Sequence, residues 1–198
     1  MFYDARANDH GLAGDPFKAL IGPRPIAWIS TMSAEGVANL APYSFFNAMA
    51  EDPHYVAFGS GGPKHTLTNI RATGVFCING VSADLAAAMN TTAAYVGPEV
   101  DEFKLANLSR APCRTIDCPR VAASPWALEC RLAQIVDLPQ TDQSVQDWLV
   151  LGRVVAVHID DRFIRAGRVD TAAMRLVGRL GYAEYATVES TWRMRRPD

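Results

Sequence analysis

The chain has 198 residues, of which 49% are hydrophobic and 20% charged, and this balance is typical of one globular domain with a real core. The formal net charge is −2, and no basic face is concentrated enough to favour nucleic acid as a ligand. We interpret the basic tail, residues 189–198, as a solvated terminus. We therefore expect a single domain over residues 1–198, with residues 1–20 as an N-terminal extension.

No stretch approaches the roughly 18 consecutive apolar residues of a membrane helix. Asp4, Arg6 and Asp9 stand where a signal peptide would be apolar, so we expect a cytoplasmic protein with no membrane partner. The four cysteines are too few for a disulfide scaffold, and the pair Cys113 and Cys118 lacks the second pair that zinc requires. The four histidines have no metal-ligand spacing. We expect reduced thiols and no metal site.

Short strand-like runs dominate the chain. We expect strands over residues 25–31, 43–49, 54–59, 75–79, 127–138 and 148–159. Residues 33–36 are typical of a hairpin turn, with Gly36 free to take a positive φ. In the run 127–138 apolar residues alternate with Glu129, Arg131 and Asp137, which predicts a half-buried strand with these charges facing outward. The run 148–159 is apolar on both faces, which indicates a central strand with a bulge at Gly152.

Three short helices are expected, over residues 64–73, over residues 83–89 and after Asp101. Gly74 can end the first in the left-handed conformation, and Ser82 and Asp101 can cap the other two. Because so few helices interrupt hairpin-connected strands, the regular alternation of a doubly wound sheet is absent. An antiparallel barrel with helical insertions fits better.

Two motifs are missing from the sequence. There is no G-x-G-x-x-G, so a Rossmann dinucleotide site is excluded at the level of motif. There is no G-x-S-x-G either, because Phe58 stands where the first glycine before Ser60 should be.

Two clusters could carry chemistry. The loop 59–66 (GSGGPKHT) leaves a strand and enters a helix, where free N–H groups, Lys64 and the hydroxyls of Ser60 and Thr66 could hold a phosphate. An ordinary hairpin end and helix cap is equally compatible with it. The second cluster, Ser30 and Thr31 with residues 39–47, could line a slot for a flat heteroaromatic ring, or could be an ordinary strand with exposed polar residues.

Several runs occur in order from about residue 20 to 188: PRPIAWIST at 23–31, N-x-A-P-Y-S-x-F at 39–46, K-H-T-x-x-N-I at 64–70, F-x-x-N at 76–79, M-N-x-T at 89–92, S-P-x-A-L-E-C at 124–130 and R-L-G at 179–181. Together they resemble the flavin reductase-like family, the flavoredoxins and monooxygenase reductase components built on the FMN-binding split barrel.

The resemblance implies a mainly β fold, a six-stranded antiparallel Greek-key split barrel with short flanking helices. It also implies a homodimer with one FMN per subunit near the dimer interface, and we expect Trp126, Tyr182 and Tyr185, outside the strands, to contribute to pairing. The implied cofactor-binding residues are Ser30, Thr31, Asn39, Ala41, Pro42, Tyr43, Ser44 and Phe45 around the ring and ribityl chain, Ser60, Lys64, His65 and Thr66 around the phosphate, and Arg179 and Gly181 closing over the flavin.

Two positions depart from the family pattern. His65 replaces the aspartate of the usual lysine-aspartate-threonine run, which puts an imidazole beside the expected phosphate site. Tyr182 stands where a second glycine is common, and its bulk could narrow the space above the ring.

The function implied by the resemblance is that of an FMN-dependent NAD(P)H:flavin oxidoreductase. A hydride passes from transiently docked NADH or NADPH to flavin N5, and reduced flavin or electrons go to a partner such as a flavin-dependent monooxygenase. Such transfer needs positioning more than an acid or base, so no residue is assigned as a catalyst, although Ser44 and neighbouring backbone amides could tune the flavin. The alternatives are a non-catalytic FMN-binding electron-transfer protein and a barrel that binds no flavin and acts as an interaction module.

Overall fold

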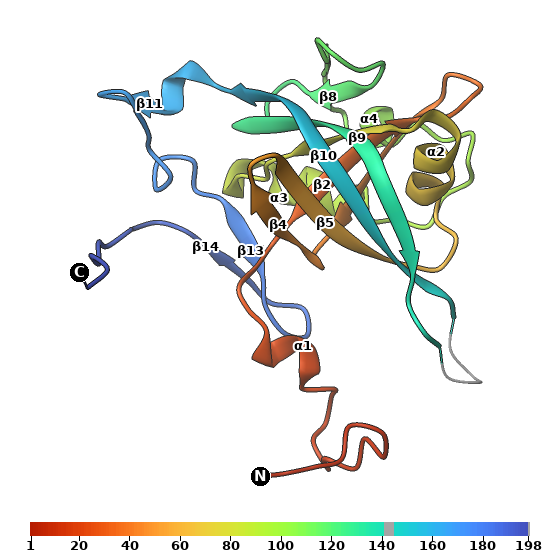
Figure 1. The fold of residues 1–198 in the computed structure, drawn as a ribbon, viewed down its shortest axis with the longest axis vertical. Helices are drawn as coiled ribbons and strands as arrows, with labels where there is room; N and C mark the ends of the chain where they lie inside the picture. The colour runs from red at the N-terminus through yellow and green to blue at the C-terminus, as the bar shows by residue number, and fades with distance from the viewer. Residues whose placement is uncertain (141–144, 198) are drawn as a thin grey trace.

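The computed structural model describes residues 1–140 and 145–197, so the predicted tail 189–198 is described except for its last residue. The chain folds into an antiparallel split barrel (Figure 1). Its large sheet has the order β3-β2-β6-β9-β10-β5-β4. These strands are β2 (Ala27–Met32), β3 (Ala38–Tyr43), β4 (Phe46–Glu51), β5 (His54–Gly61), β6 (Val75–Asn79), β9 (Trp126–Asp137) and β10 (Asp147–Ile159).

Smaller elements flank the barrel. The short strands are β1 (Arg24–Pro25), β13 (Val177–Arg179) and β14 (Tyr185–Thr187) in one sheet, with the pairs β7 (Arg110–Pro112) and β8 (Pro119–Val121), and β11 (Ile164–Arg165) and β12 (Arg168–Val169). The helices are α1 (Phe17–Leu20), α2 (His65–Thr73), α3 (Ala86–Thr91) and α4 (Glu102–Leu105), with 3-10 turns η1 (Ala83–Leu85) and η2 (Asp161–Phe163). In Figure 1 the N-terminal extension leaves the barrel beyond α1. Among the described residues, no helix is long and apolar enough to cross a membrane.

The barrel closes where β3 runs into β4. These strands follow each other in the chain but lie at opposite edges of the large sheet. Ser44 and Phe45 make the passage, and the Gly59 N–H donates to the Phe45 carbonyl at 2.8 Å. The large sheet has seven strands where six were expected, because residues 38–43 form a strand of their own, β3, which shares only Tyr43 with the strand predicted over residues 43–49.

Both faces of β2 are buried, and its alternate residues supply two cores. Ile29 packs inside the barrel with Phe58 and Phe76, while Trp28 packs on the outer side in the cluster that contains Phe103. Burying a side chain of this size contributes about 1.5 to 3 kcal/mol. The indole of Trp28 also satisfies its N–H by donating to the Thr92 hydroxyl at 2.8 Å. This strand is fixed from two sides, so it holds in place the neighbouring strand β3, which pairs with it along its whole length.

Several predicted elements are confirmed. The strand β6 has the predicted bounds, and α2 ends at Gly74, whose φ is 70° and whose N–H donates to the Ile70 carbonyl. The register of β9 and β10 shifts between Leu151 and Gly152, which is the predicted bulge. The helix expected over residues 83–89 is instead the turn η1 followed by α3, and the Ser82 side chain does not cap it.

Two expectations about side chains are wrong. Glu129 does not face outward but is fully buried, because the segment after β7 covers that face of β9. Trp126 and Tyr185 do not lie outside the strands but begin β9 and β14. The Trp126 ring occupies the space beside Gly80, where an added Cβ would lie 2.6 Å from the indole, so this ring packs within the chain.

Candidate functional site

A cavity of about 580 Å³ lies where β3, β5 and the segments around α1 and β13 meet. We call it the first cavity. The predicted site residues that line it are Pro42, Tyr43, Ser44, Phe45, Ser60, Lys64 and Arg179. They come from segments more than a hundred residues apart, which the barrel brings together.

A second cavity, of about 460 Å³, adjoins the first and shares Pro42, Tyr43, Gly61, Lys64 and Ala93 with it. The predicted residues that line only this one are Asn39, Ala41, His65 and Thr66. The two cavities thus form one continuous site with Tyr43 and Lys64 at the junction. A third hollow, beside the 33–34 turn, contains none of the predicted residues.

The start of α2 opens into the second cavity. Its N-cap is Lys64, in an extended conformation, and no side chain caps the helix. The first N–H groups of a helix have no partner within the helix and favour an anion. Gly62, with a φ of 74°, allows the tight turn that precedes the helix, and its carbonyl accepts the Lys64 N–H at 2.9 Å.

Two buried hydroxyl oxygens in the walls form no hydrogen bond of good geometry within the described residues, although the Ser60 and Thr66 hydroxyls lie close enough to Tyr43 to oppose the rise of its pKa. The two oxygens belong to Ser60 and Tyr43. Burial raises the pKa of Tyr43, which keeps its hydroxyl protonated and able to donate. Because an unsatisfied buried hydroxyl is costly, these groups suit a polar ligand in the cavity.

A buried polar network supports the start of α2 from below. The Asn39 side-chain amide donates to the hydroxyls of Thr66 at 3.0 Å and Thr31 at 3.2 Å. The Asn69 amide donates to the same Thr31 hydroxyl at 3.0 Å. The network joins β2, β3 and α2, so it fixes the glycine-rich loop relative to the barrel.

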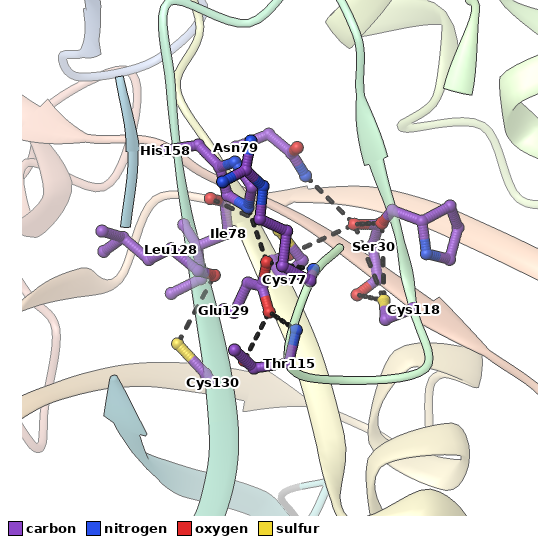
Figure 2. Close-up of polar contacts among 12 residues, drawn as sticks. Ser30, Cys77, Ile78, Asn79, Thr115, Cys118, Leu128, Glu129, Cys130 and His158 are labelled. Carbon is purple, nitrogen blue, oxygen red and sulfur yellow. Dashed lines mark hydrogen bonds and ion pairs between the residues drawn. The ribbon is translucent and has the colours of Figure 1, made fainter. Parts of the chain in front are cut away.

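Three predicted residues do not line either cavity. Thr31 lies in the network beneath the site, fully buried. Ser30 is also fully buried and donates to the Pro119 carbonyl at 2.6 Å, away from the site (Figure 2). Gly181 packs against α1, where an added Cβ would lie 2.5 Å from the Cβ of Ala19. Strand alternation in β2 and the packing of α1 therefore place these three residues behind the cavity walls, where they support the surrounding structure.

Other lining residues were missed by the sequence reasoning. In the first cavity these include Lys18, Arg24, Met89, Asp147, Trp148 and Tyr185, and in the second Glu102. Arg24 belongs to the motif at 23–31, so the sequence did offer a signal that it lies near the site. Lys18 lies in the predicted N-terminal extension, and no motif indicated that it lines a cavity. Tyr182, one of the two residues that depart from the family pattern, also lines the first cavity. The residue is 57% exposed, and its φ is 51°.

The first cavity is electropositive. Its basic lining residues are Lys18, Arg24, Lys64 and Arg179, and Asp147 is the one acidic residue among the described residues that line it. In the second cavity the buried Glu102 accepts the Leu40 N–H at 3.1 Å, and burial raises the pKa of its carboxyl. The site as a whole favours an anionic ligand with a polar edge.

A separate buried cluster centres on Glu129 (Figure 2). Its carboxylate accepts the N–H groups of Arg114 and Thr115 at 2.7 Å each and the Thr115 hydroxyl at 2.5 Å, and it pairs with His158 Nε2 at 2.5 Å. Burial raises the pKa of Glu129, but the Thr115 hydroxyl, the Arg114 amide and His158 outweigh it and lower the pKa to about 2. The cluster lines neither of the two joined cavities, and it anchors a loop to β9 and β10.

Comparison with known proteins identifies the family. Residues 22–172 match the family model described as the flavin reductase like domain. The chain belongs to the flavin reductase-like family. A relative from Deinococcus radiodurans is 40% identical over 175 residues, which cover 82% of this chain and 74% of the relative.

Solved structures agree with this membership. Component B of the nitrilotriacetate monooxygenase of Bacillus cereus superposes with a TM-score of 0.88 at 28% identity, over 98% of both chains. The 2-nitrobenzoate 2-nitroreductase of Pseudomonas fluorescens gives a TM-score of 0.81 at 32% identity, over 91% of this chain and 88% of that one. The chain is therefore a flavin reductase-like split-barrel protein, and its family chemistry is the binding or reduction of flavin.

Proposed function

We propose that the protein is an FMN-dependent NAD(P)H:flavin oxidoreductase. The observation that carries the proposal is the pair of joined cavities, one at the start of α2 and the other walled by aromatic side chains. The helix start with Lys64 suits a phosphate, and the walls of Phe45, Tyr182 and Trp148 suit a flat ring. A molecule with a ring at one end and a phosphate at the other fits this arrangement.

The residues present fit FMN. In our proposal Lys64, His65 and Thr66 hold the phosphate, while the segment from Pro42 to Phe45 borders the ring. The unpartnered hydroxyls of Ser60 and Tyr43 would then donate to polar atoms of the cofactor. FMN, when bound, supplies the capacity to accept a hydride and release electrons.

The chain's own contribution is binding, orientation and exclusion of water. The network of Thr31, Asn39 and Asn69 holds the α2 loop in place, and the buried Phe58 and Trp28 make the barrel wall rigid. Transfer of a hydride requires alignment of donor and acceptor rather than a titrating side chain. We accordingly assign no acid or base. Because the chain carries no dinucleotide fingerprint, we propose that NADH or NADPH docks transiently on the open side of the first cavity.

The kind of partner is proposed from a neighbouring structure. The Bacillus cereus neighbour is named as component B of a monooxygenase. By similarity we propose that this chain acts in the cytoplasm, forms a homodimer, and passes reduced flavin or electrons to a flavin-dependent oxygenase.

The decisive experiment is stopped-flow reduction of the FMN-loaded protein by NADH and by NADPH. We expect rapid bleaching of the bound flavin by at least one donor at millimolar concentration. Bleaching by neither would defeat the reductase assignment and favour a non-catalytic electron carrier. That alternative has one observation in its favour, since Tyr182 lines the first cavity, and a bulky ring there would hinder the docking of a nicotinamide. A purified protein that binds no flavin would defeat both.

A further inference from the structure

We propose that the first cavity contains an anion site at the Arg24 guanidinium, separate from the phosphate site at α2. It would receive the carboxylate or phosphate of the small molecule that exchanges electrons with the flavin. The identity of that molecule as a second substrate rests on the proposed function, whereas the anion site itself rests on the geometry of Arg24.

Arg24 is a buried cation with an incomplete set of partners. Its side chain lines the first cavity, yet the residue is only 6% exposed. Nη1 donates to the carbonyls of Lys18 and Ile21, and Nη2 donates to the Leu180 carbonyl at 2.8 Å. The buried Nε has no acceptor, and no acidic group among the described residues forms an ion pair with Arg24.

This arrangement is unfavourable without a ligand. A buried N–H that lacks an acceptor and a buried charge that lacks a counter-ion each cost free energy. Backbone carbonyls satisfy part of the guanidinium, but they carry only partial charge. An oxyanion at Nε would provide both the missing acceptor and the missing charge, and arginine is the side chain best suited to bind carboxylate or phosphate.

The position of Arg24 separates this site from the one at α2. Arg24, Lys18 and Arg179 line the first cavity and not the second, whereas His65 and Thr66 line the second and not the first. Two anionic groups can therefore be bound at the two ends of the joined cavities.

An aromatic ring borders the anion site. The Lys18 ammonium and the Arg24 guanidinium both lie 5.9 Å from the centre of the Phe45 ring. A ligand with a flat ring and an attached acid would place the ring beside Phe45 and the acid at Arg24. Two sources have this chemistry, an aromatic carboxylate as electron acceptor and the phosphate-bearing half of a nicotinamide donor.

The first test uses the unaltered FMN-loaded protein. Benzoate, neutral benzamide and reduced nicotinamide mononucleotide are titrated by calorimetry, and the benzoate titration is repeated in apoprotein. We expect an anionic probe to bind at least tenfold more tightly than benzamide and to weaken as salt is added. Tight benzoate binding points to the acceptor, and tight mononucleotide binding to the donor. Equal affinity for all three probes would overturn the anion site.

The second test changes the cations. Arg24→Lys keeps the charge but loses the guanidinium N–H groups, and we expect about tenfold weaker binding of the favoured probe. Because Arg24 also holds three carbonyls, this variant could fail to fold, so Lys18→Gln is the companion. Replacing the exposed Lys18 by Gln should lower the affinity for the favoured probe about threefold. Arg6→Gln, in the same N-terminal extension, should leave that affinity unchanged. Equal affinity in Lys18→Gln and the parent protein would contradict the site.

The outcomes separate the two proposals. Anion binding that depends on Arg24 or Lys18 in a protein that NADH and NADPH do not reduce would uphold the site and defeat the reductase function. Flavin reduction combined with equal affinity for benzoate, benzamide and the mononucleotide would do the reverse.

Discussion

Lys64 stands at the junction of the two cavities, with its ammonium 5.3 Å from the centre of the Tyr43 ring. A hydrogen bond to a charged group contributes about 1.5 to 3 kcal/mol. We therefore expect Lys64→Ala to weaken FMN binding by about tenfold to a hundredfold and to leave riboflavin, which has no phosphate, almost unaffected. Fluorescence titration measures both affinities.

The control for this variant is Lys104→Ala, which removes an exposed ammonium on α4 outside both cavities. It should change neither affinity. If the parent protein binds FMN and riboflavin equally well, the phosphate assignment is wrong.

Tyr182 combines a strained backbone with a position on the wall of the first cavity. Its φ is 51°, a region that costs a residue with a Cβ about 1 to 2 kcal/mol, and its exposed side chain adds little to the core. We expect Tyr182→Gly to accelerate flavin reduction by NADH or NADPH in stopped-flow experiments without lowering the urea midpoint.

Ala166→Gly is a matched control, because Ala166 also has a positive φ of 48° but lines neither cavity. It should raise stability and leave the reduction rate unchanged. A Tyr182→Gly protein that loses stability and reduces at the parent rate would show that the ring is a packing residue.

At the scale of elements, the Glu129 cluster ties the loop after β7 to β9 and β10. Its carboxyl has a pKa of about 2 in the folded chain against an ordinary value of 4.5. A lowered pKa stabilises the fold above pH 4.5, and this contribution is lost as the pH falls from 4.5 toward 2. At about 1.4 kcal/mol per pH unit, the contribution is about 3 kcal/mol.

We expect Glu129→Gln to lose roughly this free energy of unfolding at neutral pH and to show a flatter dependence of stability on pH between 5 and 2. Urea denaturation across that range measures both. The exposed Glu35→Gln in the hairpin turn serves as the control. An unchanged slope in Glu129→Gln would mean that other carboxyl groups cause the acid sensitivity.

The bulge at Gly152 makes room for a core ring. A Cβ at this position would lie 2.3 Å from Cζ of the fully buried Phe76. Overpacking of this kind costs about 1 to 3 kcal/mol, so Gly152→Ala should lower the urea midpoint. Adding Phe76→Leu should recover part of the loss, because the shorter side chain vacates the space. Strictly additive effects in this double-mutant cycle would contradict the clash.

Local sequence patterns predicted those elements that depend mainly on residues close to one another in the chain. Residues 75–79 and Gly74 were recognisable because a continuous apolar run and a left-handed helix end are local properties. Alternation placed Leu128, Cys130 and Leu132 correctly on the core face of β9, but beyond the register shift Ile135 packs there and not the predicted Val136. It could not show that a loop from residues 114–115 covers the charged face at Glu129, because that contact is made in three dimensions.

The candidate site also combines residues that local patterns indicated with residues that only tertiary packing brings there. The strand and loop segments around Tyr43 and Lys64 were expected at the site, and the structure brings them together. Ser30 was expected there because its motif neighbours are, but the alternation of β2 turns it toward Pro119. Lys18 and Trp148 reach the cavity through tertiary packing, so no spacing in the sequence indicated them.

For the whole molecule, large apolar side chains are exposed around the openings of the joined cavities. Tyr95 is 99% exposed beside the second cavity, and Phe45 is 48% exposed beside the first. Exposed apolar surface of this kind marks an interface. We expect a homodimer in sedimentation velocity at micromolar concentration, and a shift toward monomer in Tyr95→Lys. The control, Trp192→Lys in the exposed tail, should sediment like the parent. A parent protein that sediments as a monomer would contradict the dimer.

The bonds of Arg24 have a consequence for how the protein is made. Its guanidinium joins the carbonyls of Lys18 and Ile21, near the start of the chain, to that of Leu180, near its end. During translation the first segment leaves the ribosome long before Leu180 exists, so this wall of the first cavity lacks one of its hydrogen bonds until Leu180 has been synthesised. A nascent chain that lacks Leu180 thus has an incomplete first cavity, and we expect ligands of that cavity to bind only after this residue has been made.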